Sequence, residues 1–301
     1  MKVITQSELK DFQRCRRRWW LAHYRRLRKL GEYRSPLVVG NVVHDGLARY
    51  YAGELEHPLE WVKTEAERLI EELPEASDFI LKDAELAGIM LDGYMEWVEE
   101  TGADANLEAI EPERTLQAEL KPGVAIRGKL DARFRLRDSG FRGFIEHKTT
   151  GSFNDLLKTA QQNPQFLHYH LLEYLEAVEQ GMKPDEKKTD GVILNMLRKV
   201  KRSAQAKPPF YQREEVRHNI HELRNHWRHV VGLAGEITAL EARLARGEDP
   251  QYAAPPNPTK DCSWDCAFRD VCPMFDDGSD AEGFLELMYE EHDPLARYGE
   301  M

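Results

Sequence analysis

Apolar residues in the first third of the chain recur at helical spacing. The stretch Thr5-Gln6-Ser7-Glu8 has the pattern of a capping box, so a helix is expected to begin there and to run through Cys15 toward Tyr24. Three more stretches have apolar positions or composition typical of helices: 40–53, 58–73 and 78–101. This periodicity predicts a mainly helical N-terminal part.

The pattern changes to shorter, β-rich runs in the middle of the chain. Strands are expected over 113–119, 124–137 and 141–149, with a turn at Asp138-Ser139-Gly140 before the last of them. A helix follows, then two more strands and a long helix, at 155–180, 190–197, 208–218 and 219–247. Helices and strands mixed in this way predict an α/β fold.

Charge is distributed unevenly along the 301 residues, whose net charge is −11. The last stretch, 276–301, holds nine acidic residues and one arginine, and it is expected to be partly disordered. Residues 14–30 hold eight Lys or Arg and no acid, interleaved with Trp19, Trp20 and Tyr24. Such a basic segment suits contact with nucleic-acid phosphates, and the alternative is a solvated surface.

The sequence also bears on the location of the protein. No stretch approaches 18 uninterrupted apolar residues, so no membrane partner is expected. The first 15 residues lack the apolar core of a signal peptide, and a cytoplasmic location is therefore predicted.

The four cysteines have the spacing of a metal site. Three of them crowd together as Cys262-x3-Cys266-x5-Cys272, and Cys15 is the remaining candidate for a fourth ligand. Iron–sulfur clusters and structural zinc both accept four thiolates, whereas zinc sites more often use two close pairs. Four unrelated buried thiols remain the alternative.

Two acids and a lysine in the predicted hairpin form a second constellation. Side chains two apart in a strand share a face, so Glu146 and Lys148 project together, and the hairpin can bring Asp131 beside them. Carboxylates are ligands for Mg²⁺ or Mn²⁺, which activate water for phosphodiester hydrolysis. Lys148 would then orient that water or neutralise the transition state. Exposed surface charges are the alternative.

Asp131, Glu146-x-Lys148 and a helix with Gln165-x3-Tyr169 together resemble the PD-(D/E)xK nuclease superfamily. The closest resemblance is to its RecB-like exonucleases, which include the CRISPR-adaptation nucleases and the AddB nuclease domain. The N-terminal stretch from Ser7 to Trp19, the segment Gly40-x3-His44 and the cysteines match further motifs of that branch. These matches span about residues 5–272.

The resemblance implies a restriction-endonuclease-like core, with a central mixed β-sheet flanked by helices. It implies a single nuclease domain over 1–275, followed by the acidic tail 276–301. Its parts would be a helical N-terminal part, a catalytic α/β core, and a helix with the cysteine cluster, at 1–104, 105–218 and 219–275. A [4Fe–4S] cluster on Cys15, Cys262, Cys266 and Cys272 would staple the two ends together. The family usually has two residues between the first two cysteines of the trio, and this chain has three, which leaves the cluster type open.

The resemblance also implies roles for single residues. His44, Asp131 and Glu146 would bind Mg²⁺ or Mn²⁺ with the backbone carbonyl of His147, and Lys148 would be the catalytic lysine. Gln165 and Tyr169 would contact substrate. The implied activity is that of a DNA exonuclease acting on single-stranded or unwound ends. The alternative is a non-cutting DNA-binding or scaffold subunit of a recombination or CRISPR-related complex, and protein partners and self-association stay open.

Overall fold

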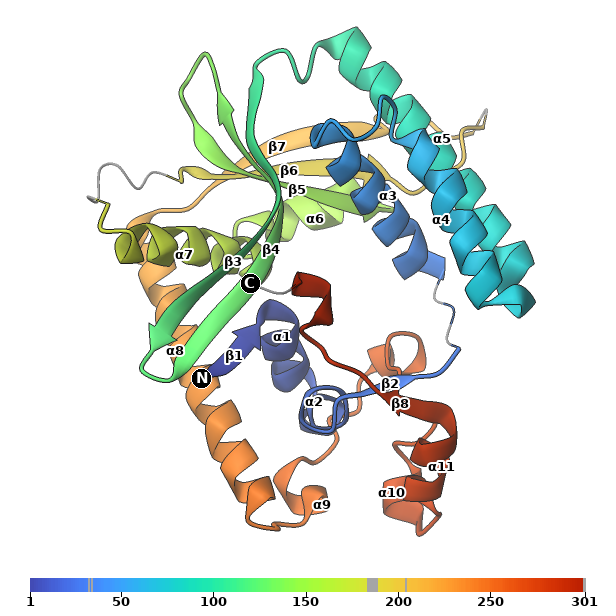
Figure 1. Ribbon diagram of the computed structural model, residues 1–301, viewed down its shortest axis with the longest axis vertical. Coiled ribbons are helices and arrows are strands. Elements are labelled where there is room, and N and C mark those ends of the chain that lie inside the picture. The colour runs from blue at the N-terminus through green and yellow to red at the C-terminus, as the bar shows by residue number, and fades with distance from the viewer. Residues whose placement is uncertain (32, 34, 183–188, 204, 300–301) are drawn as a thin grey trace. The chain divides into compact units, whose positions relative to one another are not determined.

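The computed structural model describes residues 1–31, 33, 35–182, 189–203 and 205–299. The chain forms two compact units (Figure 1). The first comprises Met1–Glu32, Gln117–Gly128 and Arg224–Met301, and the second comprises Tyr33–Leu116 and Lys129–Leu223. Strands β3 (Leu107–Lys121) and β4 (Val124–Leu136) continue from one unit into the other. No helix in the described part of the chain is long and apolar enough to cross a membrane.

The second unit is built on a mixed sheet. Its strands follow the order β4, β5 (Arg142–Thr150), β6 (Gly191–Arg198) and β7 (Tyr211–Arg217). β5 pairs parallel with β6, while β4–β5 and β6–β7 are antiparallel. β6 is almost wholly buried, because both of its faces are covered. The strands expected from the sequence are all present.

Helices cover both faces of this sheet. Phe144 of β5 contacts Tyr169 of α7 (Pro164–Glu179), with ring centroids 5.8 Å apart. His147, which points to the opposite face, stacks on Tyr51 of α3 (Ser35–Tyr51) at 5.9 Å. Because successive strand residues alternate between faces, α7 covers one side and α3 the other. The unit is therefore a mixed α/β fold with a central sheet flanked by helices, which is consistent with a restriction-endonuclease-like core.

Three helices that precede the sheet in sequence pack together in the second unit: α3, α4 (Leu59–Glu72) and α5 (Ser77–Thr101), with a 3₁₀ turn at Pro74–Ala76 between the last two. Their buried side chains make one apolar cluster with β6 and β7, which includes Val43, Leu47, Met90, Leu91 and Leu197. The three expected helices are thus confirmed, and α3 begins five residues earlier than the sequence pattern indicated.

The expected helix over 155–180 is wrong in one respect, because the structure divides it. α6 (Phe153–Ala160) ends before Asn163, and α7 begins at Pro164. Asn163 caps α7 by accepting the Gln165 N–H, and Pro164 occupies the first helical turn, where its missing N–H costs nothing. A proline also disfavours helical backbone in the residue before it, so the helix cannot continue through Asn163.

The first unit begins with β1 (Lys2–Thr5), which lies parallel to Val124–Arg127 of β4. The predicted N-cap is confirmed, since Thr5 accepts the Glu8 N–H at the start of α1 (Gln6–Arg14). The helix does not run unbroken to Tyr24, however. Cys15 has extended backbone, with φ −161° and ψ 119°, and separates α1 from α2 (Arg16–Trp19) and a π-helical turn at Trp20–Tyr24.

The rest of the first unit comes mainly from the C-terminal part of the chain. α8 (Ile220–Ala245) enters this unit at Arg224. Short elements follow: α9 (Pro250–Ala253), a 3₁₀ turn at Lys260–Ser263, α10 (Met274–Asp277), α11 (Ala281–Met288), β8 (Tyr289–Glu291) and a 3₁₀ turn at Ala296–Tyr298. β8 pairs antiparallel with β2 (Leu27–Lys29), so the acidic segment contributes a strand to this unit.

Candidate active site and cysteine cavity

The candidate site lies where β4 and β5 stop pairing. Their ladder ends at Ala132 opposite Ile145, so Asp131 and Glu146 are the first residues beyond it. The backbone N–H of His147 donates to Asp131 Oδ2 at 2.7 Å. The Asp131 carboxylate therefore takes the place of a strand partner, which fixes it beside the β5 backbone.

His44 of α3 pairs with the Asp131 carboxylate. Its Nδ1 lies 3.4 Å from Asp131 Oδ1 and 3.3 Å from Oδ2. Burial opposes the ionisation of Asp131, but the charge of His44 and the His147 N–H hold the pKa of that carboxyl well below its usual range. Burial likewise disfavours protonated His44, and the Asp131 carboxylate outweighs it, so the pKa of His44 is raised.

Glu146, Lys148 and Gln165 form a second group on the face covered by α7. Lys148 Nζ donates to Glu146 Oε1 and, at 2.8 Å, to Gln165 Oε1. Gln165 Nε2 donates to Glu146 Oε1 at 2.8 Å and to the Tyr169 hydroxyl at 3.1 Å. The expected shared face of Glu146 and Lys148 is thus present, and α7 brings Gln165 and Tyr169 to it.

One oxygen of Glu146 has no hydrogen-bond partner. Glu146 is 2% exposed, and its Oε2 is buried and unpaired. Burial raises the pKa of Glu146, although Lys148 favours the charged form. A buried carboxylate oxygen is costly unless a donor or a cation meets it. The donor types of Asp131, Glu146 and His44 suit a hard divalent cation, with a bias toward Mn²⁺ from the imidazole, but these three side chains are not gathered closely enough in the described structure to hold one.

The ring of His147 lies on the face of the sheet opposite to Glu146, because neighbouring strand residues alternate between faces. It is 1% exposed, and burial lowers its pKa to about 3. Its Nδ1 accepts a hydrogen bond of 2.7 Å from Asn195 Nδ2 on β6. What the structure brings to Asp131 is therefore the backbone of His147.

A buried polar network holds the His147 ring and was not predicted from the sequence. Asn195 Nδ2 also donates to the Tyr94 hydroxyl at 3.1 Å, and Arg213 Nε donates to Asn195 Oδ1 at 3.1 Å. Arg213 in turn pairs with Asp104 at 2.6 Å. The available signal was Asn195 itself, the one polar residue within the apolar run Val192–Leu197. A polar residue fully buried in a central strand needs such partners.

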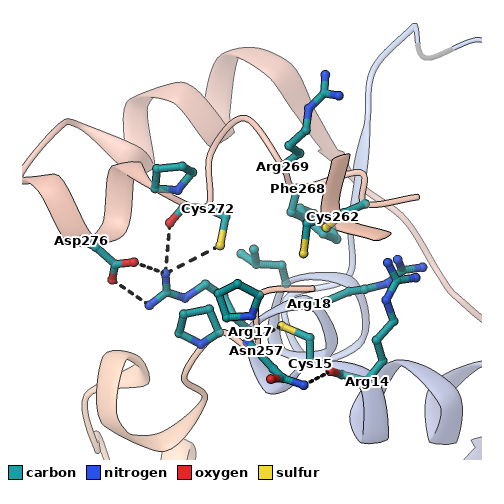
Figure 2. Close-up of a pocket in the computed structure, with 15 residues that line it drawn as sticks. Arg14, Cys15, Arg17, Arg18, Asn257, Cys262, Phe268, Arg269, Cys272 and Asp276 are labelled. Atoms are coloured by element: carbon teal, nitrogen blue, oxygen red, sulfur yellow. Dashed lines mark hydrogen bonds and ion pairs between the residues drawn. The ribbon is translucent and has the colours of Figure 1, made fainter. Parts of the chain in front are cut away.

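The four cysteines line one cavity in the first unit, with a volume of about 350 Å³. They are unpaired and half-buried, and Figure 2 shows the sulfurs of Cys15 and Cys272 directed into the cavity. Among the described residues, however, no three His, Cys, Asp or Glu side chains are gathered closely enough to hold a metal ion. The structure therefore brings the predicted cysteines to one place without establishing an iron–sulfur site.

Three of these sulfurs face N–H donors. The backbone N–H groups of Asn257 and Thr259 donate to Cys15 Sγ at 3.3 Å and Cys262 Sγ at 3.4 Å. Arg17 Nη1 donates to Cys272 Sγ at 3.8 Å (Figure 2). Burial raises the pKa of Cys272, and Arg17 opposes that shift. Such donors favour thiolates, which are the form that ligates metals. Thiolates are ligands of both iron–sulfur clusters and structural zinc, and the geometry of the described residues does not distinguish the two.

The basic segment 14–30 is largely neutralised within the first unit. Seven of its eight cations form ion pairs there: Arg14–Asp265, Arg16–Glu236, Arg17–Asp276, Arg18–Asp11, Arg25–Glu282, Arg28–Glu290 and Lys29–Asp270. The run of positive charge seen in the sequence is therefore mostly structural. Its assignment as a phosphate-binding surface is not supported by these contacts.

The chain belongs to the PD-(D/E)XK nuclease superfamily, whose sequence model matches residues 3–273. Membership indicates a metal-dependent nuclease, that is, a hydrolase acting on nucleic acid. No curated protein matches the chain significantly. A solved structure described as "Crystal structure of SSO0001" is 17% identical to this chain, with a TM-score of 0.33. The match covers 90% of this chain and 86% of the chain in that structure.

Proposed function

We propose that the protein is a DNA exonuclease of the RecB-like branch, acting on single-stranded or unwound ends. The observation that carries the proposal is that Glu146 Oε2 is buried and has no hydrogen-bond partner. Glu146 is next to His147, whose backbone N–H donates to Asp131. Family membership supplies the reaction class, and this pair of carboxylates supplies a place for the divalent ion that the reaction needs.

Asp131, Glu146 and His44 would hold Mg²⁺ or Mn²⁺, with the His147 carbonyl as a further ligand. When bound, the ion polarises the phosphate and lowers the pKa of a water molecule. The contact between His44 and Asp131 keeps that carboxylate ionised, and the His147 N–H keeps it in place. Because of these two contacts, Asp131 is ionised and correctly placed before a cation binds.

Lys148 would act on the attacking water or on the charge that develops on the phosphate. Gln165 accepts from its ammonium and so holds it beside Glu146, on the sheet face covered by α7. A fixed cation is worth more than a mobile one, because no reorganisation is needed during the reaction. The Tyr169 hydroxyl accepts from Gln165 Nε2 on the same helix face and would contact substrate.

We also propose that the cysteine cavity holds a structural [4Fe–4S] cluster. The supporting observations are the four cysteines around one cavity and the N–H donors on three of their sulfurs. The cluster would join the segment around Cys15 to the segment 262–272 and so staple both ends of the chain. Absorption near 400 nm and iron content test this directly.

The decisive experiment is incubation of end-labelled single- and double-stranded DNA with Mg²⁺ or Mn²⁺, with EDTA as the control. We expect stepwise shortening from single-stranded ends and no cutting of circular single-stranded DNA. Lys148→Ala and Asp131→Ala should each lower the rate by at least about 100-fold. Lys158→Ala, which removes an exposed lysine of α6, should leave it unchanged. Full activity in either site variant would overturn the mechanism, and DNA binding without cleavage in the unaltered protein would favour the scaffold alternative.

A further inference from the structure

Two buried histidines lie together in the second unit, outside the Asp131–Glu146 site. His170 is on α7 and is 3% exposed, and His218 directly follows β7 and is 7% exposed. Their ring centroids are 5.8 Å apart. The proposed nuclease mechanism uses neither ring. Burying two imidazoles costs free energy unless their nitrogens find partners, so the pair needs an explanation.

Hydrogen bonds to backbone carbonyls fix the tautomer of each ring. His170 Nε2 lies 2.6 Å from the carbonyl oxygen of Thr189, and His218 Nε2 lies 3.2 Å from that of Gln161. A carbonyl oxygen can only accept, so Nε2 carries the hydrogen in both rings. Each neutral imidazole therefore presents a bare lone pair on Nδ1. Both Nδ1 atoms are buried and have no hydrogen-bond partner.

This arrangement is the one that histidine ligands of metals usually show. The ring nitrogen that does not bind the metal donates to a carbonyl or carboxylate, which orients the other nitrogen toward the ion. With metal–nitrogen distances of about 2 Å and tetrahedral angles, two imidazoles on one ion have centroids about 5 Å apart. The observed separation of 5.8 Å is close to that value.

An acidic side chain lies beside the pair. Burial lowers the pKa of His170 to about 4 and also lowers that of His218, and the Glu222 carboxylate opposes both shifts. Glu222 currently accepts from Gln161 Nε2 at 2.8 Å and from the Asn219 N–H at 2.7 Å. Among the described residues, Glu222 and the two rings do not form a three-ligand group. Glu222 lies in the first turn of α8, and its charge acts on both imidazoles.

We propose that His170 and His218 bind one divalent transition-metal ion, represented by Zn²⁺, through their Nδ1 atoms, with Glu222 as the acidic ligand. Imidazole nitrogen is a preferred donor for Zn²⁺, and a carboxylate and a water complete such sites. The ion joins α7, which carries Gln165 and Tyr169, to the segment between β7 and α8. The competing occupant is a water molecule that donates to both Nδ1 atoms.

The test compares the zinc content of purified variants after equilibration with Zn²⁺ and removal of the excess. We expect His170→Gln and His218→Gln each to bind one equivalent less than the unaltered protein. His221→Gln, which changes an exposed histidine of α8, is the matched control and should bind the full amount. Iron content and the rate of DNA cleavage report on the other two candidate sites and should stay unchanged. Equal zinc content in all four proteins would overturn the proposal.

A measurement on the unaltered protein tests the proposal even if the variants fail to fold. Crystals soaked in Zn²⁺ should give an anomalous difference peak at the zinc absorption edge, in contact with both Nδ1 atoms. A water molecule in that position without an anomalous peak would show that the histidines hold solvent, and the metal site would be abandoned.

Discussion

At the residue scale, the candidate site is marked by a buried carboxylate oxygen without a hydrogen-bond partner. Glu146 Oε2 is buried and unpaired, while its other oxygen accepts from both Lys148 and Gln165. The unpaired oxygen is where the proposed cation would bind. The same residue supplies the sharpest test of cation binding, because its charge can be removed with little change in shape.

Millimolar Mg²⁺ should raise the melting temperature of the unaltered protein. An ion that binds the folded state alone stabilises it by about 3 kcal/mol when its concentration is 100 times its dissociation constant. In Glu146→Gln we expect most of this increase to vanish, because the amide cannot offset the charge of the ion. Asp155→Asn, at an exposed carboxylate of α6, is the control and should keep it. Thermal unfolding with and without EDTA measures the difference, and an equal response in both variants would contradict the assignment.

Asn195 is expected to position the site through His147. Asn195→Ala removes the donor to His147 Nδ1 and the acceptor of Arg213 Nε, so the free energy of unfolding should fall by about 1–3 kcal/mol. The loosened β5 backbone should also raise the Mg²⁺ concentration needed for half-maximal cleavage. Gln212→Ala, on the neighbouring strand β7, is the control. An Asn195→Ala protein that is less stable but has an unchanged Mg²⁺ requirement would show a purely structural role.

At the element scale, two interruptions between helices lie at or next to candidate functional residues. Cys15 adopts extended backbone between α1 and α2, and Asn163 does so between α6 and α7. The second break was readable from Pro164. The first was not, because Cys15 lies in a run with no glycine or proline and its conformation accompanies contacts to Asn257, far along the chain. Local pattern predicts where helices exist, and distant contacts decide where they are interrupted.

Asp11 should make the first unit sensitive to acid. Burial opposes its ionisation, but the hydrogen bond to His23 and the charge of Arg18 lower its pKa. Between the unfolded and folded pKa values the unfolded chain binds the extra proton, so this stabilisation is present above pH 4 and is lost as the pH falls below it. Asp11→Asn should flatten the dependence of the free energy of unfolding on pH below about 4. Denaturant titrations at several pH values measure it, with Asp92→Asn as the exposed control, and equal slopes in both variants would refute the assignment.

At the scale of the whole molecule, much of the architecture follows from sequence pattern. The strands and most helix positions, the shared face of Glu146 and Lys148, and the grouping of the cysteines were all readable from spacing. The polar network around His147 was not, because its members Tyr94, Asn195 and Arg213 come from three separate elements. The pairing of the basic segment 14–30 was equally hidden, since its partners lie mostly beyond residue 230. Periodicity records burial, whereas ion pairs depend on which segments meet.

The paired cations predict a weak contribution of that segment to DNA binding. When a substitution removes one phosphate contact, the slope of log affinity against log salt concentration should decrease in magnitude by about 1. Arg28→Gln removes a cation already paired with Glu290, so we expect the slope to change by far less than that. Binding of single-stranded DNA across a series of salt concentrations provides the measurement. A full unit of change for Arg28→Gln would restore this segment as a DNA-binding surface.

The division of the chain among the two units has a consequence for biosynthesis. The second unit is complete once Leu223 has been made, whereas the first needs residues from both ends of the chain. Cys15 leaves the ribosome early and must wait until Cys272 has followed before all four thiols can meet. Any cofactor can therefore enter the cysteine cavity only late in maturation. A nascent chain stalled before codon 262 would contain the whole candidate cleavage centre but would lack Cys262, Cys266 and Cys272.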